Sequence, residues 1–174
     1  MAVEIPASVR LQKSNLTFPT EDPMPARPPR VAVRAIIVNE DRLLLVNAWP
    51  GGRSRLLCAP GGGVETGHSL TENLAREVAE ETGLVVEVGQ PCLVNEFHDP
   101  ESGFHQVEIF FRCQLTGSAQ IDPNWRDPEK VVSEHHWVTR DQMSGLSFKP
   151  SSLAAVAFAT DDCLTYDPLE PILR

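Results

Sequence analysis

The chain has 174 residues, of which 41% are hydrophobic and 22% are charged, as is ordinary for one globular domain with its own core. Its 24 acidic and 15 basic residues give a formal net charge of −9, which argues against binding duplex nucleic acid through a basic stripe. Because no stretch resembles a signal peptide or approaches the roughly 18 apolar residues of a membrane span, we expect a cytoplasmic protein with no membrane contact.

The four cysteines lie far apart and form no Cys-x-x-Cys pair: Cys58, Cys92, Cys113 and Cys163. Three of them fall within apolar, strand-like stretches. We therefore expect buried free thiols in a reducing compartment rather than disulfides or zinc ligands.

Residues 1–30 contain six prolines, which predicts an extended arm rather than a helix or a central strand. The arm could pack along the domain, cover a cleft or reach the partner subunit of a homodimer.

The first apolar runs, residues 31–38 and 43–46, flank a polar Asn-Glu-Asp-Arg turn and predict a β-hairpin with a four-residue loop. Arg34 lies inside the first run and needs a partner if it is buried. It either binds a phosphate or a base of a ligand or forms a structural ion pair. After a loop over 49–54, residues 55–59 predict a short strand that leads into Pro60 and three glycines.

A helix with well-marked ends follows the glycines. Ser69 is a suitable N-cap, Glu72 completes a capping box, and Gly83 is a natural C-terminal stop. At about 100° per residue, three glutamates fall within an arc of roughly 100° beside the apolar stripe, so their carboxylates could converge on one point: Glu77, Glu80 and Glu81.

The rest of the chain alternates between strand and turn signals, and the clearest strand, over 106–115, places apolar and polar side chains on opposite faces. Further strands are expected over 84–88, 92–97 and 135–138, a turn over 98–103, a loop over 122–130, and a second helix over 152–160.

Glutamates clustered on a helix are usually a solvated face, but beside a glycine loop they suit Mg²⁺, which prefers oxygen ligands and bridges to substrate phosphates. Glycines let the backbone approach a metal and phosphates closely. A metal ion held there can activate water and stabilise charge on phosphoryl oxygens.

Residues 62–84 resemble the Nudix box, Gly-x5-Glu-x7-Arg-Glu-U-x-Glu-Glu-x-Gly-U, where U is a bulky aliphatic residue. Eight of its nine defined positions match, and the departure is His68, which replaces the first glutamate. The order of the expected elements is also similar. The resemblance therefore implies an α+β Nudix fold, with a mixed central β-sheet sandwiched between α-helices over 31–160. The N-terminal arm (1–30) and the C-terminal tail (161–174) lie outside it.

The resemblance also implies a ligand set for Mg²⁺, which Mn²⁺ could replace: Glu77, Glu80, Glu81 and the Gly62 carbonyl. Glu77 or Glu81 would also act as the base, and Arg76 would orient these carboxylates by charge-assisted hydrogen bonds. Glu129, in a loop before the last strand, is a further catalytic candidate, and surface charge is the alternative.

The substrate-binding candidates are the residues around the glycine loop together with one strand residue: Gly61, Gly62, Gly63, Glu65, His68 and Arg34. Glu65 could partly substitute for the missing glutamate. We expect His68 to reduce metal affinity or activity rather than to abolish it, because Mg²⁺ prefers oxygen to nitrogen.

The implied activity is Mg²⁺-dependent hydrolysis of a small nucleotide pyrophosphate, a nucleoside diphosphate linked to another moiety, by attack of water on phosphorus. Pro100, 16 residues past Leu84, resembles the proline spacing of ADP-ribose pyrophosphatases, but a nucleoside triphosphate stays open as substrate. Trp49, Phe97 and Phe104 could stack on a base. The alternative is a Nudix-like sensor that binds a nucleotide without hydrolysing it.

Overall fold

The computed structural model describes residues 28–161 and 163–172, so most of the expected proline-rich arm lies outside the described residues. Within these described residues, eight strands form one mixed sheet in the order β3-β2-β1-β5-β4-β7, with β6 beside β2 and β8 beside β4. The strands are β1 (Arg30–Asn39), β2 (Arg42–Asn47), β3 (Leu57–Cys58), β4 (Val86–Asp99), β5 (Phe104–Leu115), β6 (His135–Thr139), β7 (Thr165–Tyr166) and β8 (Glu170–Pro171). The helices are η1 (Pro50–Gly52), α1 (Leu70–Thr82), α2 (Arg140–Met143) and α3 (Leu153–Ala157).

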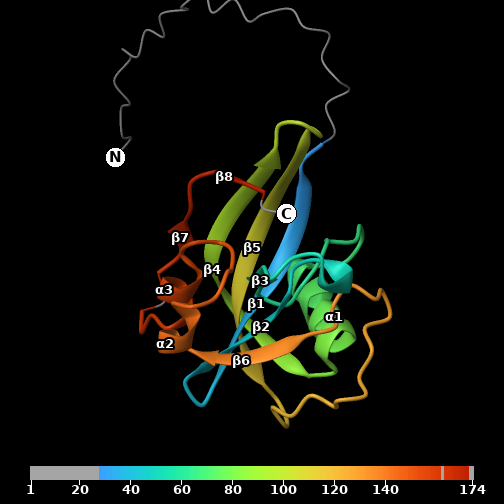
Figure 1. Ribbon diagram of the computed structural model, residues 1–174, viewed down its shortest axis with the longest axis vertical. Coiled ribbons are helices and arrows are strands. Elements are labelled where there is room, and N and C mark those ends of the chain that lie inside the picture. The colour runs from blue at the N-terminus through green and yellow to red at the C-terminus, as the bar shows by residue number, and fades with distance from the viewer. Residues whose placement is uncertain (1–27, 162, 173–174) are drawn as a thin grey trace, which may run out of the picture.

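Helices cover both faces of the sheet: α1 lies on one side, and α2 and α3 lie on the other (Figure 1). Alternate residues of β1 feed two separate cores, because successive strand side chains point to opposite faces. Val33 and Ile37 pack with Leu74 of α1, whereas Ile36 packs with Leu153 of α3. The expected α+β architecture, a mixed sheet between helices, is confirmed.

The predicted hairpin is present, but its predicted four-residue loop is wrong. β1 and β2 stay paired up to Asn39 and Arg42, which leaves a turn of two residues. Both turn residues have positive φ, 49° at Glu40 and 58° at Asp41. Such a turn matches the twist of the two strands, which explains why the pairing continues further than the polarity of the sequence indicates.

The two strands expected over 84–88 and 92–97 are one continuous strand, β4, which pairs with β5 and contains register shifts on either side of Pro91. Proline has no N–H to donate, so it is accommodated at an irregularity in the ladder rather than by ending the strand.

The C-terminal half contains elements that the sequence analysis did not expect. Thr139 and Gln142 form a capping box that starts α2, a pattern that the sequence does carry. The expected helix over 152–160 is shorter, as α3.

Within the expected tail, β7 and β8 pair in parallel with β4, and the Ile172 N–H donates to the His98 carbonyl at 3.0 Å. The described part of the tail therefore adds two short strands to the sheet.

The four cysteines are free thiols, but the expectation that all are buried is wrong for Cys163, which is exposed. Cys92 and Cys113 are buried and Cys58 is half-buried. Over the residues that the structure describes, none of the helices has the length and apolar character needed to cross a membrane.

Candidate active site

The glycine loop runs alongside the first half of β1 like an additional strand. The Val33 N–H donates to the Gly62 carbonyl at 2.9 Å, and the Ala35 N–H donates to the Pro60 carbonyl at 2.8 Å. β2 leaves this part of β1 open because its ladder with β1 involves only the end of that strand. Gly61 has φ of 137°, and a Cβ there would lie 2.1 Å from the Val33 carbonyl oxygen, so only glycine fits.

Helix α1 presents its carboxylates to this loop. Its start and end are as predicted: Ser69 and Glu72 form the capping box, and Gly83 ends the helix with φ of 72°. Leu74 and Val78 are fully buried beneath the sheet and fix the rotation of the helix about its axis. The acidic side of α1 therefore faces the glycine loop.

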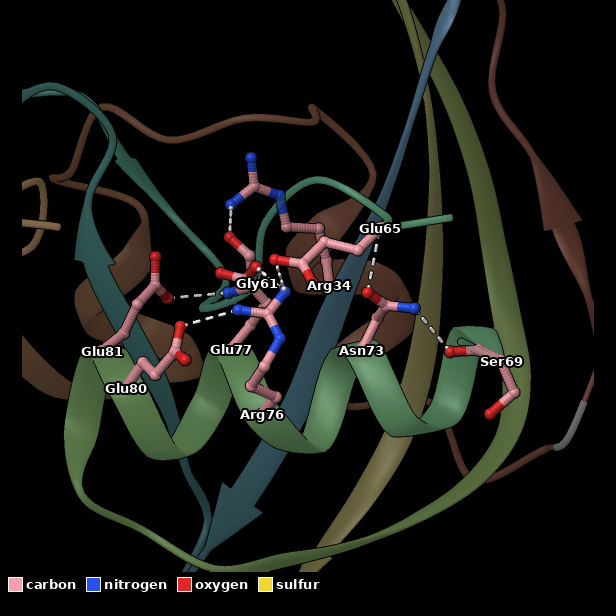
Figure 2. A network of polar contacts seen from close by, with 9 residues as sticks. All are labelled: Arg34, Gly61, Glu65, Ser69, Asn73, Arg76, Glu77, Glu80 and Glu81. Carbon is pink, nitrogen blue, oxygen red and sulfur yellow. Dashed lines mark hydrogen bonds and ion pairs between the residues drawn. The ribbon is translucent and has the colours of Figure 1, made fainter. Parts of the chain in front are cut away.

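Glu77 and Glu81 point from α1 toward the glycine loop (Figure 2), and both are less than 10% exposed. The Gly61 N–H donates to Glu81 Oε2 at 2.8 Å. The Glu77 carboxylate lies against Gly62, where a Cβ would be 2.2 Å from Oε2. A side chain at position 62 would therefore clash with Glu77, and the Gly62 carbonyl accepts the Val33 N–H.

Arg76 separates the third glutamate from the other two. Its Nη2 donates to Glu77 Oε1 and its Nη1 to Glu80 Oε2, both at 2.7 Å (Figure 2), and Glu80 does not line the cavity described below. The three carboxylates therefore do not converge as the helical periodicity predicts. Within the described ranges, no group of three or more His, Cys, Asp or Glu side chains is arranged to hold a metal ion.

Glu65 is the third carboxylate beside Arg76, with Oε1 at 3.4 Å from Nη2. Its backbone is fixed by Asn73, which is 1% exposed, accepts the Glu65 N–H at 2.9 Å and donates to the Ser69 carbonyl at 2.7 Å. His68 is exposed at the start of the helix and does not line the cavity described below. Glu65, not residue 68, therefore supplies the loop carboxylate at Arg76.

The loop before β6 brings Glu129 to the same place through buried polar side chains. The Asp127 carboxylate accepts the N–H groups of Glu129, Val131 and Val132 at 2.8 to 2.9 Å. Asn47 of β2 donates to the Val131 carbonyl at 2.8 Å. This loop is therefore tightly bound although it has no regular structure. Sequence reasoning missed Asn47, because nothing in its neighbourhood reveals a partner 84 residues away.

These segments enclose an acidic cavity of about 280 Å³, lined by Arg30, Arg34, Asn47, Ala48, Cys58, Gly61, Gly62, Gly63, Glu65, Glu77, Glu81, Glu129 and Val131. Burial raises the pKa of Glu81 to about 7, against the opposing effects of Arg34 and the Gly61 N–H. Burial also raises the pKa of Glu77, although Arg76 opposes it. The charge of these carboxylates is thus under-compensated, which favours binding of a cation.

A larger aromatic cavity of about 510 Å³ adjoins the acidic one, and Arg30, Arg34, Ala48 and Cys58 line both. Its other lining residues are Trp49, Leu56, Phe97, Asp99, Ser102, Phe104, Gln106, Glu108, Lys149 and Ile172. The polar face of β5 forms part of this wall, and Gln106 and Glu108 are only 6% and 3% exposed. That face lines a cavity instead of meeting bulk solvent.

Arg34 lies between the two cavities and forms the structural ion pair that was one of its two predicted roles. Its Nε donates to Glu108 Oε1 at 2.8 Å, and its Nη1 donates to the Gly61 carbonyl at 2.5 Å. Burial lowers the pKa of Arg34, but the combined effect of Glu108, Cys58 and Glu81 raises it above its usual value, so the guanidinium stays charged. Arg34 therefore connects the glycine loop to the floor of the aromatic cavity.

Comparison with known proteins identifies the architecture. The family model described as NUDIX domain matches residues 28–157. An ADP-ribose pyrophosphatase of Methanocaldococcus jannaschii is 33% identical over 51% of this chain and 53% of its own length. A MutT-like protein of Streptomyces ambofaciens is 33% identical over 66% of both chains. This chain thus spans between half and two thirds of the length of these relatives.

Solved structures show the same fold. A UDP-X diphosphatase superimposes with a TM-score of 0.63 at 23% identity, covering 81% of this chain and 68% of that one. A NUDIX hydrolase from Nitrosomonas europaea gives a TM-score of 0.65 at 22% identity, covering 79% and 93%.

Proposed function

The chain belongs to the Nudix family, and from this premise we propose that it is a metal-dependent pyrophosphohydrolase. It would cleave a nucleoside diphosphate linked to another moiety by attack of water on phosphorus. The observation that carries this proposal is the pair of buried carboxylates, Glu77 and Glu81, in a cavity that opens into an aromatic one. The first suits a metal-bound diphosphate, and the second suits the organic part of the substrate.

The donor set fits a hard divalent cation. The acidic cavity offers carboxylate oxygens and no imidazole, and burial has raised the pKa of two of its carboxyls, so a bound cation would relieve their charge. Glu77 and Glu81 would hold Mg²⁺ or Mn²⁺, and Glu80 would be an outer ligand, since Arg76 binds it in the present arrangement. When bound, the ion activates water and stabilises charge on the phosphoryl oxygens.

The surrounding residues would hold the reacting groups and move the proton. Glu129 lines the cavity, and no described residue donates a hydrogen bond to its carboxylate. We therefore assign Glu129 the role of general base toward the attacking water. Arg76 keeps Glu77 turned inward through a 2.7 Å hydrogen bond, and Glu65 keeps Arg76 in place from the loop side.

The aromatic cavity supports a substrate with a ring system beyond the phosphates. Trp49, Phe97 and Phe104 line it and could stack on a base. The relatives named as ADP-ribose pyrophosphatase and UDP-X diphosphatase act on such compounds. We place the reaction in a reducing cytoplasm, because the exposed Cys163 is a free thiol.

The test is a panel of substrates with Mg²⁺: ADP-ribose, UDP-sugars, dinucleotides, 8-oxo-dGTP and ordinary nucleoside triphosphates. Glu81→Gln serves as the control, because the amide keeps an acceptor for the Gly61 N–H and removes the charge. Turnover of one class that is lost in the control supports hydrolysis at this site. Nucleotide binding without turnover of any compound would instead identify a non-hydrolytic sensor.

A further inference from the structure

The junction between the acidic and the aromatic cavity contains two arginines, Arg30 and Arg34, which line both. A diphosphate that joins a metal-bound group to an organic group in the aromatic cavity must pass this junction. A basic side chain that binds the diphosphate there must have a positive charge and N–H groups that no carboxylate of the protein already occupies. The cations around the two cavities differ sharply in this respect.

Most of these cations are already paired with carboxylates. Arg34 is bound to Glu108, and its side chain is only 16% exposed. Lys149 is bound to Glu170 of β8. Arg76 is bound to Glu77 and Glu80. Recruiting any of these groups to a phosphate would leave a carboxylate unpaired, which is costly where that carboxylate is buried.

Arg30 is different, because its guanidinium contacts a neutral partner. Its Nη1 donates to Gln106 Oε1 at 2.8 Å, and within the described residues no carboxylate lies within ion-pair distance of it. Gln106 in turn donates to Glu108 Oε1 at 2.8 Å. The guanidinium is thus oriented by a chain of hydrogen bonds that ends at the ion pair of Arg34, while its charge remains uncompensated.

The glycine loop keeps the Arg30 guanidinium at the junction. A Cβ at Gly63 would lie 2.4 Å from Arg30 Nη2 and 3.0 Å from its Cζ, so the fork lies directly against the loop backbone. Arg30 itself is exposed, and its remaining N–H groups are accessible to a ligand. A planar fork with free donors is suited to bidentate contact with phosphate oxygens.

We infer that Arg30 binds the diphosphate of the substrate at the junction of the two cavities, and that Gly63 is glycine so that this guanidinium can lie there. The inference rests on the proposed function for the identity of the substrate. It gives Arg34 a separate task, which is to hold Glu108 and the glycine loop in place. Arg30 is then a binding residue, whose loss weakens substrate affinity more than the chemical step.

The first experiment compares Arg30→Gln with Arg30→Lys on the substrate that the panel identifies. The glutamine keeps a donor for Gln106 but removes the charge, and we expect KM to rise about 10- to 100-fold with kcat nearly unchanged. The lysine keeps the charge without the fork, so its KM should be intermediate. Arg53→Gln is the matched control, because Arg53 is exposed and lines neither cavity.

A second variant displaces Arg30 without removing it. Gly63→Ala places a methyl group where the guanidinium lies, and the φ of Gly63 is not in the left-handed region, so the backbone should tolerate the change. We expect a rise in KM like that of Arg30→Gln, and no further rise when both changes are combined. An unchanged KM in Arg30→Gln, or full additivity of the two changes, would overturn the inference.

A binding measurement separates this inference from the proposed function. Calorimetric titration with α,β-methylene-ADP in EDTA needs neither metal nor turnover. Weaker binding by Arg30→Gln than by the Arg53→Gln control supports the inference even if the wild type hydrolyses nothing. Equal binding by the two variants contradicts the inference, even if wild-type turnover supports the proposed function.

Discussion

The acidic and the aromatic cavity share an edge but differ in how the chain builds them. The carboxylates of the acidic cavity come mostly from one stretch, the glycine loop and α1, and among the described residues only Glu129 comes from another segment. The aromatic cavity takes side chains from β1, β3, β4, β5, η1-flanking residues and the C-terminal segment. Under the proposed function, the chemical step would depend on a short local motif and substrate selectivity on residues brought together from distant parts of the chain. Changes in the two cavities should therefore have different kinetic signatures.

The largest effect should follow from removing an inner carboxylate. Glu81→Gln should lower kcat about 10³-fold, because it removes a buried negative charge that would hold the cation. Glu80→Gln should cost far less, since Glu80 is held outside the cavity by Arg76. Steady-state kinetics with Mg²⁺ would measure both. Equal losses in the two variants would show that Glu80 is an inner ligand and would remove the distinction between the two sides of the helix.

The same local and long-range contrast explains what the sequence could predict. Neighbouring residues determine the caps of α1, its buried stripe and the order of loop and helix. Ser69, Gly83 and the glutamates of the Nudix box could therefore be located without a structure. Glu77 and Glu81 could not be separated from Glu80, because that depends on which carboxylates line the cavity beside the glycine loop. Arg30 and Ile172 were missed, because strand register and the pairing of β8 bring them to the cavities.

The acidic cavity should also make folding stability depend on pH. The pKa of Glu81 is raised from 4.5 to about 7. Between these two pH values, the native protein therefore keeps a proton on Glu81 that the unfolded chain releases. This contribution to stability is therefore full below about pH 4.5 and is lost as the pH rises through about 7, by about 3 kcal/mol at most.

Thermal or urea unfolding in EDTA at pH 5 and pH 8 would measure this dependence. Wild type should lose more stability than Glu81→Gln over the interval, because the amide does not titrate. The difference between the two proteins isolates Glu81 from other titrating groups. Parallel pH profiles would mean that Glu81 titrates with an ordinary pKa and that its charge in the acidic cavity is fully compensated.

A smaller loss should follow from moving Glu77 rather than removing it. Gly62→Ala places a Cβ at 2.2 Å from Glu77 Oε2, so the carboxylate must move to make room for it. A displacement of about 1 Å costs about 10²-fold in rate. Because the φ of Gly62 is not left-handed, the melting temperature should change much less than in Gly61→Ala, where the new Cβ meets the backbone of β1. Kinetics and melting curves of both variants separate the two cases.

The next smaller loss of activity should come from changing Glu65, the loop carboxylate beside Arg76. Glu65→Gln should lower kcat about 10-fold, because Arg76 then holds Glu77 less firmly, as when an outer partner of a metal ligand is lost. Adding His68→Glu should restore part of the activity if a carboxylate at the start of the helix can take over. Glu72→Gln is a control for loss of charge at the same helix end, and an equal loss of activity there would contradict a specific role for Glu65.

The smallest effect should come from the far wall of the aromatic cavity, where Ile172 of the C-terminal segment contributes a side chain. Ile172→Trp narrows this cavity and should raise KM about fivefold with little change in kcat, because filling a pocket acts on the bound organic group and not on the reacting phosphorus. Leu169→Trp is the matched control, since Leu169 is 45% exposed and lines neither cavity. If Ile172→Trp lowered kcat as steeply as Glu81→Gln, the two cavities would act as one unit. A rise confined to KM, and larger for substrates with bulkier organic groups, would instead assign selectivity to a segment beyond residue 157, where the match to the family model ends.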